Sequence, residues 1–310
     1  MIDIFLQQLI NGLVMGSVYA IVALGYTLVY GIMRLINFAH GEVVMIGAMI
    51  ALSVINALEN SGLPAFVIVG GGLLTAIPSC MVVGYLIERI AYRPLRGAPS
   101  LAPLITAIGV SIVLQNLAMM IWGKEFVPFP PLLDDFMRYF SILDATINSV
   151  QLFIIAVSVV MMVGLNYLIN KTQLGNAMRA TAQNAEVAGL MGVNTNQIIS
   201  LTFIIGSALA AVAGMMVTMN YNVAHYDMGF MLGLKAFTAA VLGGIGHLRG
   251  AMLGGILLGV IESMGAGYLG ELTHGLFGSN YQDVFAFFTL IGVLIFKPSG
   301  LLGKAVGERP

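Results

Sequence analysis

Residues 170–196 form a polar segment, NKTQLGNAMRATAQNAEVAGLMGVNTN, in an otherwise apolar chain. Each hydrophobic run beside it is long enough to cross a bilayer, so the segment must lie at a membrane surface. Asn184 can accept a hydrogen bond from a free amide in the first turn of a helix, Glu186 falls in that turn, and Gly192 can end the helix. The pattern predicts a short surface helix, which is either a simple capped loop or a place where a partner docks.

Three ionisable residues, Glu42, Lys235 and Glu262, fall inside or at the edge of apolar runs. An unpaired charge at the centre of a bilayer costs roughly 3 kcal/mol even on a lenient scale, so such residues usually face a polar pathway or one another. Two interpretations stay open for Lys235 and Glu262: an ion pair between helices, or a polar lining for a solute pathway.

Two apolar runs begin with polar residues and a glycine, as broken helices do. The first begins with Asn37, His40, Gly41 and Glu42, and the second with Asp227 and Gly229. Free amides at such helix starts can hold polar groups of a solute, although helix capping would give the same pattern. These residues are therefore candidates for lining a pathway, together with Lys235 and Glu262.

Enzyme signatures are absent from the sequence. It contains no HExxH or GxSxG motif and no cysteine pattern for a metal, and its four histidines lie in different predicted loops. The string closest to a nucleotide-binding loop, residues 300–305, has the wrong spacing and lacks the Ser or Thr that would hold Mg²⁺. We expect no catalytic residue, no metal site and no bound cofactor, so any energy from ATP must come from a partner.

The composition is that of a protein surrounded by lipid. Of the 310 residues, 59% are hydrophobic and only 9% are charged, whereas a soluble domain carries about 25% charged residues. The 13 basic and 14 acidic side chains cannot cover a soluble core of this size. The net charge of −1 gives no reason to expect a nucleic-acid partner.

A helical crossing needs about 20 apolar residues, and we find nine such runs, with eight or ten spans left open. They predict an all-α polytopic membrane protein in which residues 1–310 form a single membrane-spanning domain. The runs lie at residues 8–30, 42–58, 64–90, 99–122, 150–169, 197–219, 228–245, 250–269 and 282–297.

Basic residues are unevenly divided between the two sides that nine spans define. Because loops rich in Lys and Arg stay in the cytoplasm, the division places the N-terminus outside, and the C-terminus and residues 170–196 inside. Lys124 and Arg138 fall on the outer side, and Lys235 lies within a span. The basic residues on the inner side are Arg34, Arg89, Arg93, Arg96, Lys171, Arg179, Arg249, Lys297, Lys304 and Arg309.

The largest outer loop, residues 124–149, contains three prolines followed by DDFMRYFSILDATIN. Apolar residues alternate there with charges, which predicts a short amphipathic helix along the outer membrane surface. A plain connector between two spans is the alternative.

Two spans share a pattern of small residues. The pattern GSxxAxxA begins at Gly16 in the first span and at Gly206 in the sixth. Because these spans run in opposite directions, the copies indicate an inverted repeat, with halves at residues 8–122 and 197–297, as in many transporters.

Three blocks carry a resemblance that extends over nearly the whole chain. They are GSVYAIVALGYTLVYGIMRLINFAHGEVVMIGA at residues 16–48, TQLGNAMRATAQNAEVAGLMGVN at 172–194 and AFTAAVLGGIGHLRGAMLGGILLG at 236–259. The chain resembles the integral-membrane permeases of ABC importers and, among them, the branched-chain amino-acid permease subunits.

The resemblance implies a permease of the bacterial inner membrane that carries leucine, isoleucine and valine. Its partners would be a second homologous permease, two cytoplasmic ATPase subunits that use ATP and Mg²⁺, and a periplasmic amino-acid-binding protein.

In such importers a short cytoplasmic helix of the permease docks into a groove of the ATPase. Residues 185–192 match its pattern, although Glu186-Val187-Ala188 replaces the family's Glu-Ala-Ala. The resemblance assigns to this coupling loop Gly175, Arg179, Asn184, Ala185, Glu186, Ala188, Gly189 and Gly192.

The competing function is a secondary transporter that works alone on an H⁺ or Na⁺ gradient. Glu42, Lys235 and Glu262 would then form its ion relay.

Overall fold

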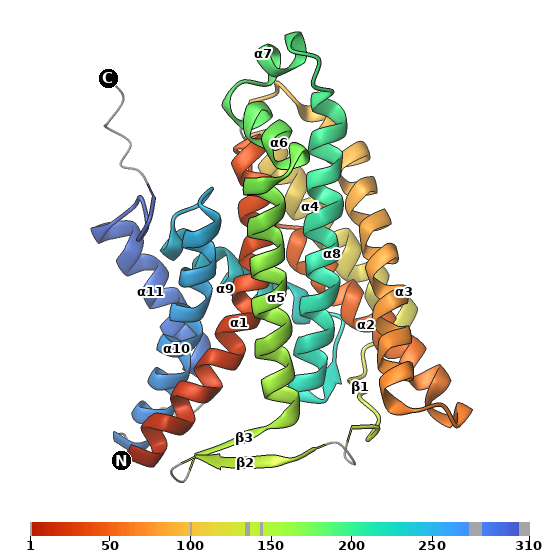
Figure 1. Ribbon diagram of the computed structural model, residues 1–310, viewed down its shortest axis with the longest axis vertical. Coiled ribbons are helices and arrows are strands. Elements are labelled where there is room, and N and C mark those ends of the chain that lie inside the picture. Colours follow the sequence, from red (N-terminus) through yellow and green to blue (C-terminus); the bar gives the residue numbers. More distant parts are fainter. Residues whose placement is uncertain (1, 100, 134–136, 143–144, 273–280, 304–310) are drawn as a thin grey trace. The chain divides into compact units, whose positions relative to one another are not determined.

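The computed structural model describes residues 2–99, 101–133, 137–142, 145–272 and 281–303, and these are mostly helical (Figure 1). Lys304 and Arg309, which contributed to the predicted orientation, lie outside the described residues.

Within the described residues, an apolar helix occupies each of the nine predicted runs. Seven helices are long and apolar enough to cross a membrane, and α9 (Met228–Gly243) and α11 (Gln282–Phe296) are shorter. The prediction of an all-α polytopic membrane protein is confirmed. The seven long helices are α1 (Ile2–Met33), α2 (His40–Leu58), α3 (Ala65–Leu86), α4 (Leu101–Trp122), α5 (Ser149–Lys171), α8 (Thr195–Tyr221) and α10 (Leu248–Leu272).

Shorter elements join these helices. A 3₁₀ turn, η1 (Glu59–Ser61), follows α2. At the end of α3, a π-helical stretch, η2 (Ile87–Tyr92), leads into a second 3₁₀ turn, η3 (Arg93–Leu95). The polar segment forms two helices, α6 (Gln173–Gln183) and α7 (Ala185–Leu190).

The amphipathic helix predicted in the outer loop is wrong for the residues that the structure describes. Strand β2 (Tyr139–Ile142) pairs antiparallel with β3 (Ala145–Asn148), and β1 (Val127–Pro128) pairs with β4 (Val223–Ala224). Burial alternates along β3, so the apolar pattern there has the period of a strand. Aromatic and β-branched residues favour a hairpin in this stretch, and the prolines before it cannot donate helical hydrogen bonds.

Contacts divide the chain into two compact units. The first comprises Met1–Thr27, Asp135–Met162 and Lys235–Pro310, and the second comprises Leu28–Asp134 and Val163–Leu234.

In the second unit, α2, α3 and α8 pack against one another through small residues. A Cβ added at Gly47 would lie 2.6 Å from the Ala211 Cα, and one at Gly72 would lie 2.9 Å from the Ala51 carbonyl oxygen. Such contacts let helix backbones approach closely in a membrane. Helices α6 and α7 lie past the ends of α5 and α8 (Figure 1).

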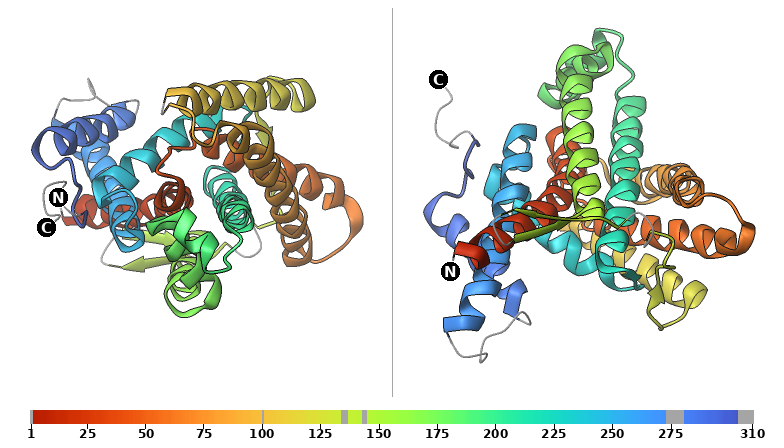
Figure 2. Two further views of the ribbon diagram at one scale, coloured as in Figure 1. Left: turned by 90° about the horizontal axis from the view of Figure 1, so that it is seen from above. Right: turned by 60° about the horizontal axis from the view of Figure 1, so that its bottom comes forward.

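In the first unit, the N-terminal part of α1 runs beside α10 (Figure 2). A Cβ added at Gly12 would lie 2.7 Å from the Val260 Cα, and one at Gly16 would lie 2.8 Å from the Ile256 Cα. Glycine is therefore required where these two backbones meet.

Candidate functional site

The polar segment begins with a sharp corner between α5 and α6. The Thr172 hydroxyl accepts a hydrogen bond from the Gly175 amide at 3.1 Å and caps α6. A Cβ at Gly175 would overlap the Ile169 carbonyl, so only glycine fits. Arg179 donates to that same carbonyl oxygen at 2.8 Å, which satisfies a free acceptor at the end of α5. Gly175 and Arg179 thus fix the direction in which the segment leaves α5.

The next helix, α7, has the capping predicted from the sequence. Asn184 Oδ1 accepts hydrogen bonds from the amides of Glu186 and Val187 at 3.0 and 3.1 Å. Gly192 has a φ of +86°, and its amide donates to the Gly189 carbonyl at 3.0 Å. The helix predicted over residues 184–192 is confirmed as α7, while α6 was missed although Thr172 signals its start.

Helix α7 presents apolar side chains to the outside of the chain. Leu190 and Met191 are 88% and 81% exposed, and Val187 is about half exposed. Ala188 is buried against the rest of the segment, and the space around Gly189 is open. Exposed apolar groups gathered on a polar surface segment make α7 a candidate for contact with another protein or with lipid.

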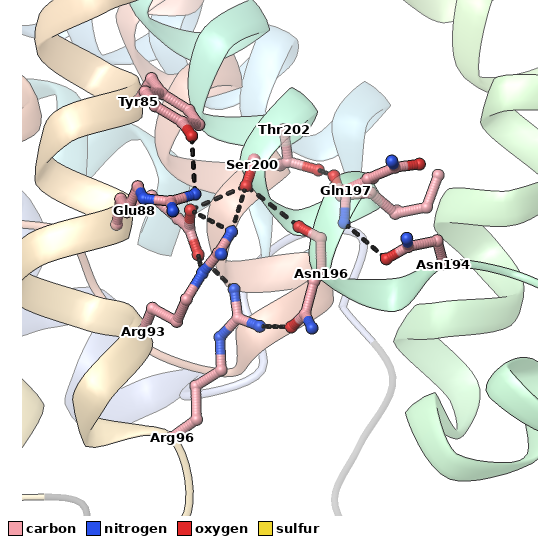
Figure 3. A network of polar contacts seen from close by, with 11 residues as sticks. Tyr85, Glu88, Arg93, Arg96, Asn194, Asn196, Gln197, Ser200 and Thr202 are labelled. Atoms are coloured by element: carbon pink, nitrogen blue, oxygen red, sulfur yellow. Dashed lines mark hydrogen bonds and ion pairs between the residues drawn. The ribbon is translucent and has the colours of Figure 1, made fainter.

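A buried polar cluster ties the next helix, α8, to the end of α3 (Figure 3). The fully buried Glu88 carboxylate in η2 accepts from the Ser200 hydroxyl at 2.7 Å and from Arg93 Nη2 at 3.2 Å. Arg96 donates both to Glu88 and to Asn196 Oδ1. Burial lowers the pKa of Arg96, and the nearby Glu88 carboxylate opposes that shift, so the guanidinium keeps its charge.

We call Glu88, Arg93, Arg96, Asn196 and Ser200 the Glu88 cluster. Sequence reasoning missed it, because the arginines served only to orient the chain. An acidic residue beside several arginines at the end of an apolar run was the available signal.

The starts of α2 and α9, which share a polar and glycine pattern, meet in the second unit. A Cβ on Gly229 would lie 2.6 Å from the Gly41 carbonyl oxygen and 2.7 Å from Glu42 Oε2. Glu42 is fully buried and accepts a hydrogen bond from the Ser111 hydroxyl at 3.0 Å. Its carboxyl group also interacts electrostatically with Asp227. Gly41, Glu42 and Asp227 therefore lie together.

Asn37 and His40, also predicted to line a pathway, are buried just before and at the start of α2. Asn37 Oδ1 accepts from the Tyr92 hydroxyl at 3.0 Å, which ties the residues before α2 to η2.

A second group of buried charges lies in the first unit. Lys235 of α9 pairs with the fully buried Glu262 of α10 and, at 2.5 Å, with Asp283 of α11. The Lys235 ammonium is also 3.4 Å from the Tyr19 hydroxyl of α1. The ion pair predicted between Lys235 and Glu262 is present, whereas Tyr19 and Asp283 were missed because they lie far away in the sequence.

Membrane-spanning helices around buried charges, with a polar segment folded past their ends, define a multi-pass α-helical membrane protein of the permease type. The family model described as "Branched-chain amino acid transport system / permease component" matches residues 8–294, and the chain belongs to this family.

Three relatives illustrate the similarity. The chain is 47% identical to the high-affinity branched-chain amino acid transport system permease protein BraD of Pseudomonas aeruginosa, over 98% of each chain. It is 43% identical to the permease protein LivH of the corresponding Escherichia coli K12 system, over 98% of this chain and 97% of LivH. It is 26% identical to a probable LivH of Methanocaldococcus jannaschii, over 97% of this chain and 94% of that relative.

Proposed function

We propose that the chain is one permease subunit of an ABC importer and forms, with a second homologous permease, the pathway for leucine, isoleucine and valine. The family and the printed names of BraD and LivH support this substrate class. The chain itself does not hydrolyse ATP. Two cytoplasmic ATPase subunits use ATP and Mg²⁺, and a periplasmic binding protein delivers the amino acid.

The exposed apolar surface of α7 is the observation that carries the proposal. Val187, Leu190 and Met191 face away from the chain on a polar segment at the membrane surface. Without a partner they would leave apolar area in water, whereas a groove on an ATPase would bury it. The proposal puts residues 170–196 in the cytoplasm and the chain in the bacterial inner membrane, with its N-terminus outside and its C-terminus inside; the uneven distribution of Lys and Arg between the two sides supports this orientation.

Transport follows from movement of this docked helix. Closure of the ATPases on ATP pulls on α7, and the helices respond by exposing the pathway alternately to the two sides. The joined starts of α2 and α9, with Glu42, and the Lys235 group are the candidate polar linings.

The test is leucine uptake into proteoliposomes that contain this chain, its partner permease, both ATPases and the binding protein. We expect uptake to require ATP and to stop when the ATPases carry a substitution that blocks hydrolysis. The competing function makes the opposite prediction: the purified chain alone would accumulate leucine on an H⁺ or Na⁺ gradient without ATP. That result would overturn the proposal.

A further inference from the structure

The polar segment must be joined firmly to the membrane helices if a partner is to move them through it. Residues 191–194 are all that separate α7 from α8. The Val193 amide donates to the Ala188 carbonyl at 3.0 Å, and Asn194 Oδ1 accepts from the Gln197 amide at 3.2 Å as the cap of α8. The first turns of α8 are therefore the nearest membrane-helix structure that a pull on α7 reaches.

The Glu88 cluster forms hydrogen bonds to those same turns of α8. Ser200 and Asn196 lie in the first two turns of α8, and both bond to residues that follow α3 in the chain (Figure 3). The Ser200 hydroxyl also receives a hydrogen bond from Arg93 Nη2 at 2.9 Å. One buried carboxylate thus organises two guanidinium groups and a hydroxyl, and such charge-assisted bonds fix geometry more firmly than neutral ones.

The backbone around Glu88 departs from an ordinary α-helix. Glu88 lies in the π-helical stretch η2, and π-helical turns are rare and frequently found at functional sites. The same stretch reaches the start of α2, because the Tyr92 hydroxyl donates to Asn37 Oδ1 and the Tyr92 ring packs 5.3 Å from that of Phe203 in α8. Three helices of the second unit therefore meet at η2.

We infer that Glu88 is a positioning residue for coupling: it locks the start of α8 to the end of α3, so that a pull on α7 moves α3 and α8 as one body. The inference rests on the proposed function, because it assumes that ATPases act through α7. Without the carboxylate, two arginines repel each other beside Ser200, and α8 can yield to the pull without carrying α3 with it.

The main test is Glu88→Gln in the complete reconstituted importer, with Arg89→Gln as the matched control. Gln has nearly the size of Glu but no charge. Arg89 is the next residue, and its hydrogen bond goes to Tyr85 rather than to the cluster. We expect Glu88→Gln to bind the ATPases normally and to transport about tenfold fewer leucine molecules per ATP hydrolysed, while Arg89→Gln matches wild type. An unchanged ratio in Glu88→Gln would overturn the inference.

A cross-linking experiment tests whether Glu88 holds α8 to the end of α3, even if Glu88→Gln lowers the yield of folded protein. Arg96 and Asn196, which bond in the native chain, are both replaced by cysteine in the Glu88→Gln variant, after the one native cysteine, Cys80, is changed to Ala. A thiol cross-linker then joins the end of α3 to α8 again. We expect it to restore at least half of the wild-type ratio of uptake to hydrolysis, and no recovery in the cross-linked protein would refute the lock.

Different results would overturn the proposed function and the role of Glu88. If wild-type chain does not bind the ATPases at all, the proposed function falls. If wild type binds and transports but the ratio in Glu88→Gln is normal, only the role of Glu88 falls.

Discussion

Two glycines of the polar segment illustrate how one residue type serves opposite needs. Gly175 is enclosed by the backbone at the end of α5, so any side chain would force α6 away from its path. Gly189 has open space around it within this chain. Among the described residues no contact requires glycine at position 189, so a larger side chain there would leave the fold intact and would meet only what docks on α7 in the proposed importer.

Replacing Gly189 with Leu should therefore uncouple transport without harming the fold. We expect normal expression and an unchanged melting temperature, with ATP-driven leucine uptake reduced about tenfold, because the new side chain holds the ATPase groove away from α7. Uptake into proteoliposomes and thermal unfolding measure the two effects. Gly164→Leu is the control, because Gly164 is also open and exposed but lies in the middle of α5. Wild-type uptake by the Gly189 variant would count against docking through α7.

His225 gives the paired strands β1 and β4 a dependence on pH. Burial alone would lower the pKa of His225, but hydrogen bonds to Asp227 and to the Lys124 carbonyl, with the charges of Asp227 and Glu125, raise it overall. Because both partners accept, only the protonated ring donates to both. The ring also stacks on Phe126 at 4.3 Å.

Because the pKa of His225 is raised in the folded state, protonated His225 stabilises the pairing of β1 with β4 fully below about pH 6.5. This stabilisation is lost as the pH rises through the raised value. We expect the Phe129 amide, which donates to the Asn222 carbonyl beside β4, to exchange with solvent several-fold faster at pH 8 than at pH 6 after correction for the intrinsic rate. In His225→Gln the corrected rates should be equal at the two pH values. A pH dependence that persists in the variant would exclude His225 as its source.

At the scale of the helices, buried charges join α9, α10 and α11. Lys235→Met would leave the Glu262 carboxylate buried without its cation, which costs about 3–5 kcal/mol. The double variant Lys235→Met with Glu262→Gln removes the nearly buried and the fully buried charge and leaves only the partly exposed Asp283 without its partner, so it should recover most of that loss. Melting temperatures of the purified protein in detergent test this, with the exposed Lys297→Met as control. If the double variant were as unstable as the single one, the pair would not be what holds these helices.

The helices themselves could be predicted, because a membrane requires long apolar runs and the sequence contains few other features. The capping of α7 could be predicted for the same reason, since Asn184 and Gly192 act within a few residues. The hairpin of β2 and β3 could not, because alternating residues in a short loop suit a helix or a strand until pairing decides. The Glu88 cluster joins residues about a hundred positions apart, and no local pattern encodes such a distance.

At the scale of the whole molecule, the two compact units do not coincide with the halves of the predicted inverted repeat, at residues 8–122 and 197–297. Instead, the first helix of each half packs with later helices of the other: Gly16 of α1 against α10, and Ser207 of α8 against Gly84 of α3. The shared pattern GSxxAxxA provides both contacts. The repeat stays a prediction, and an exchange of first helices is the arrangement that these contacts favour.

The side of the membrane on which each loop lies tests the proposed function. Nine spans, the predicted repeat and docking through α7 all require the polar segment and the loop before β1 to lie on opposite sides of the membrane. Single cysteines at Phe126 and Gln173, both exposed, in a Cys80→Ala chain would report this. In intact cells an impermeant maleimide should label Phe126→Cys at once, and Gln173→Cys only after the membrane is permeabilised. Labelling of Gln173→Cys from outside would put the polar segment out of reach of any ATPase. The membrane helices could then be moved only by a solute or ion gradient.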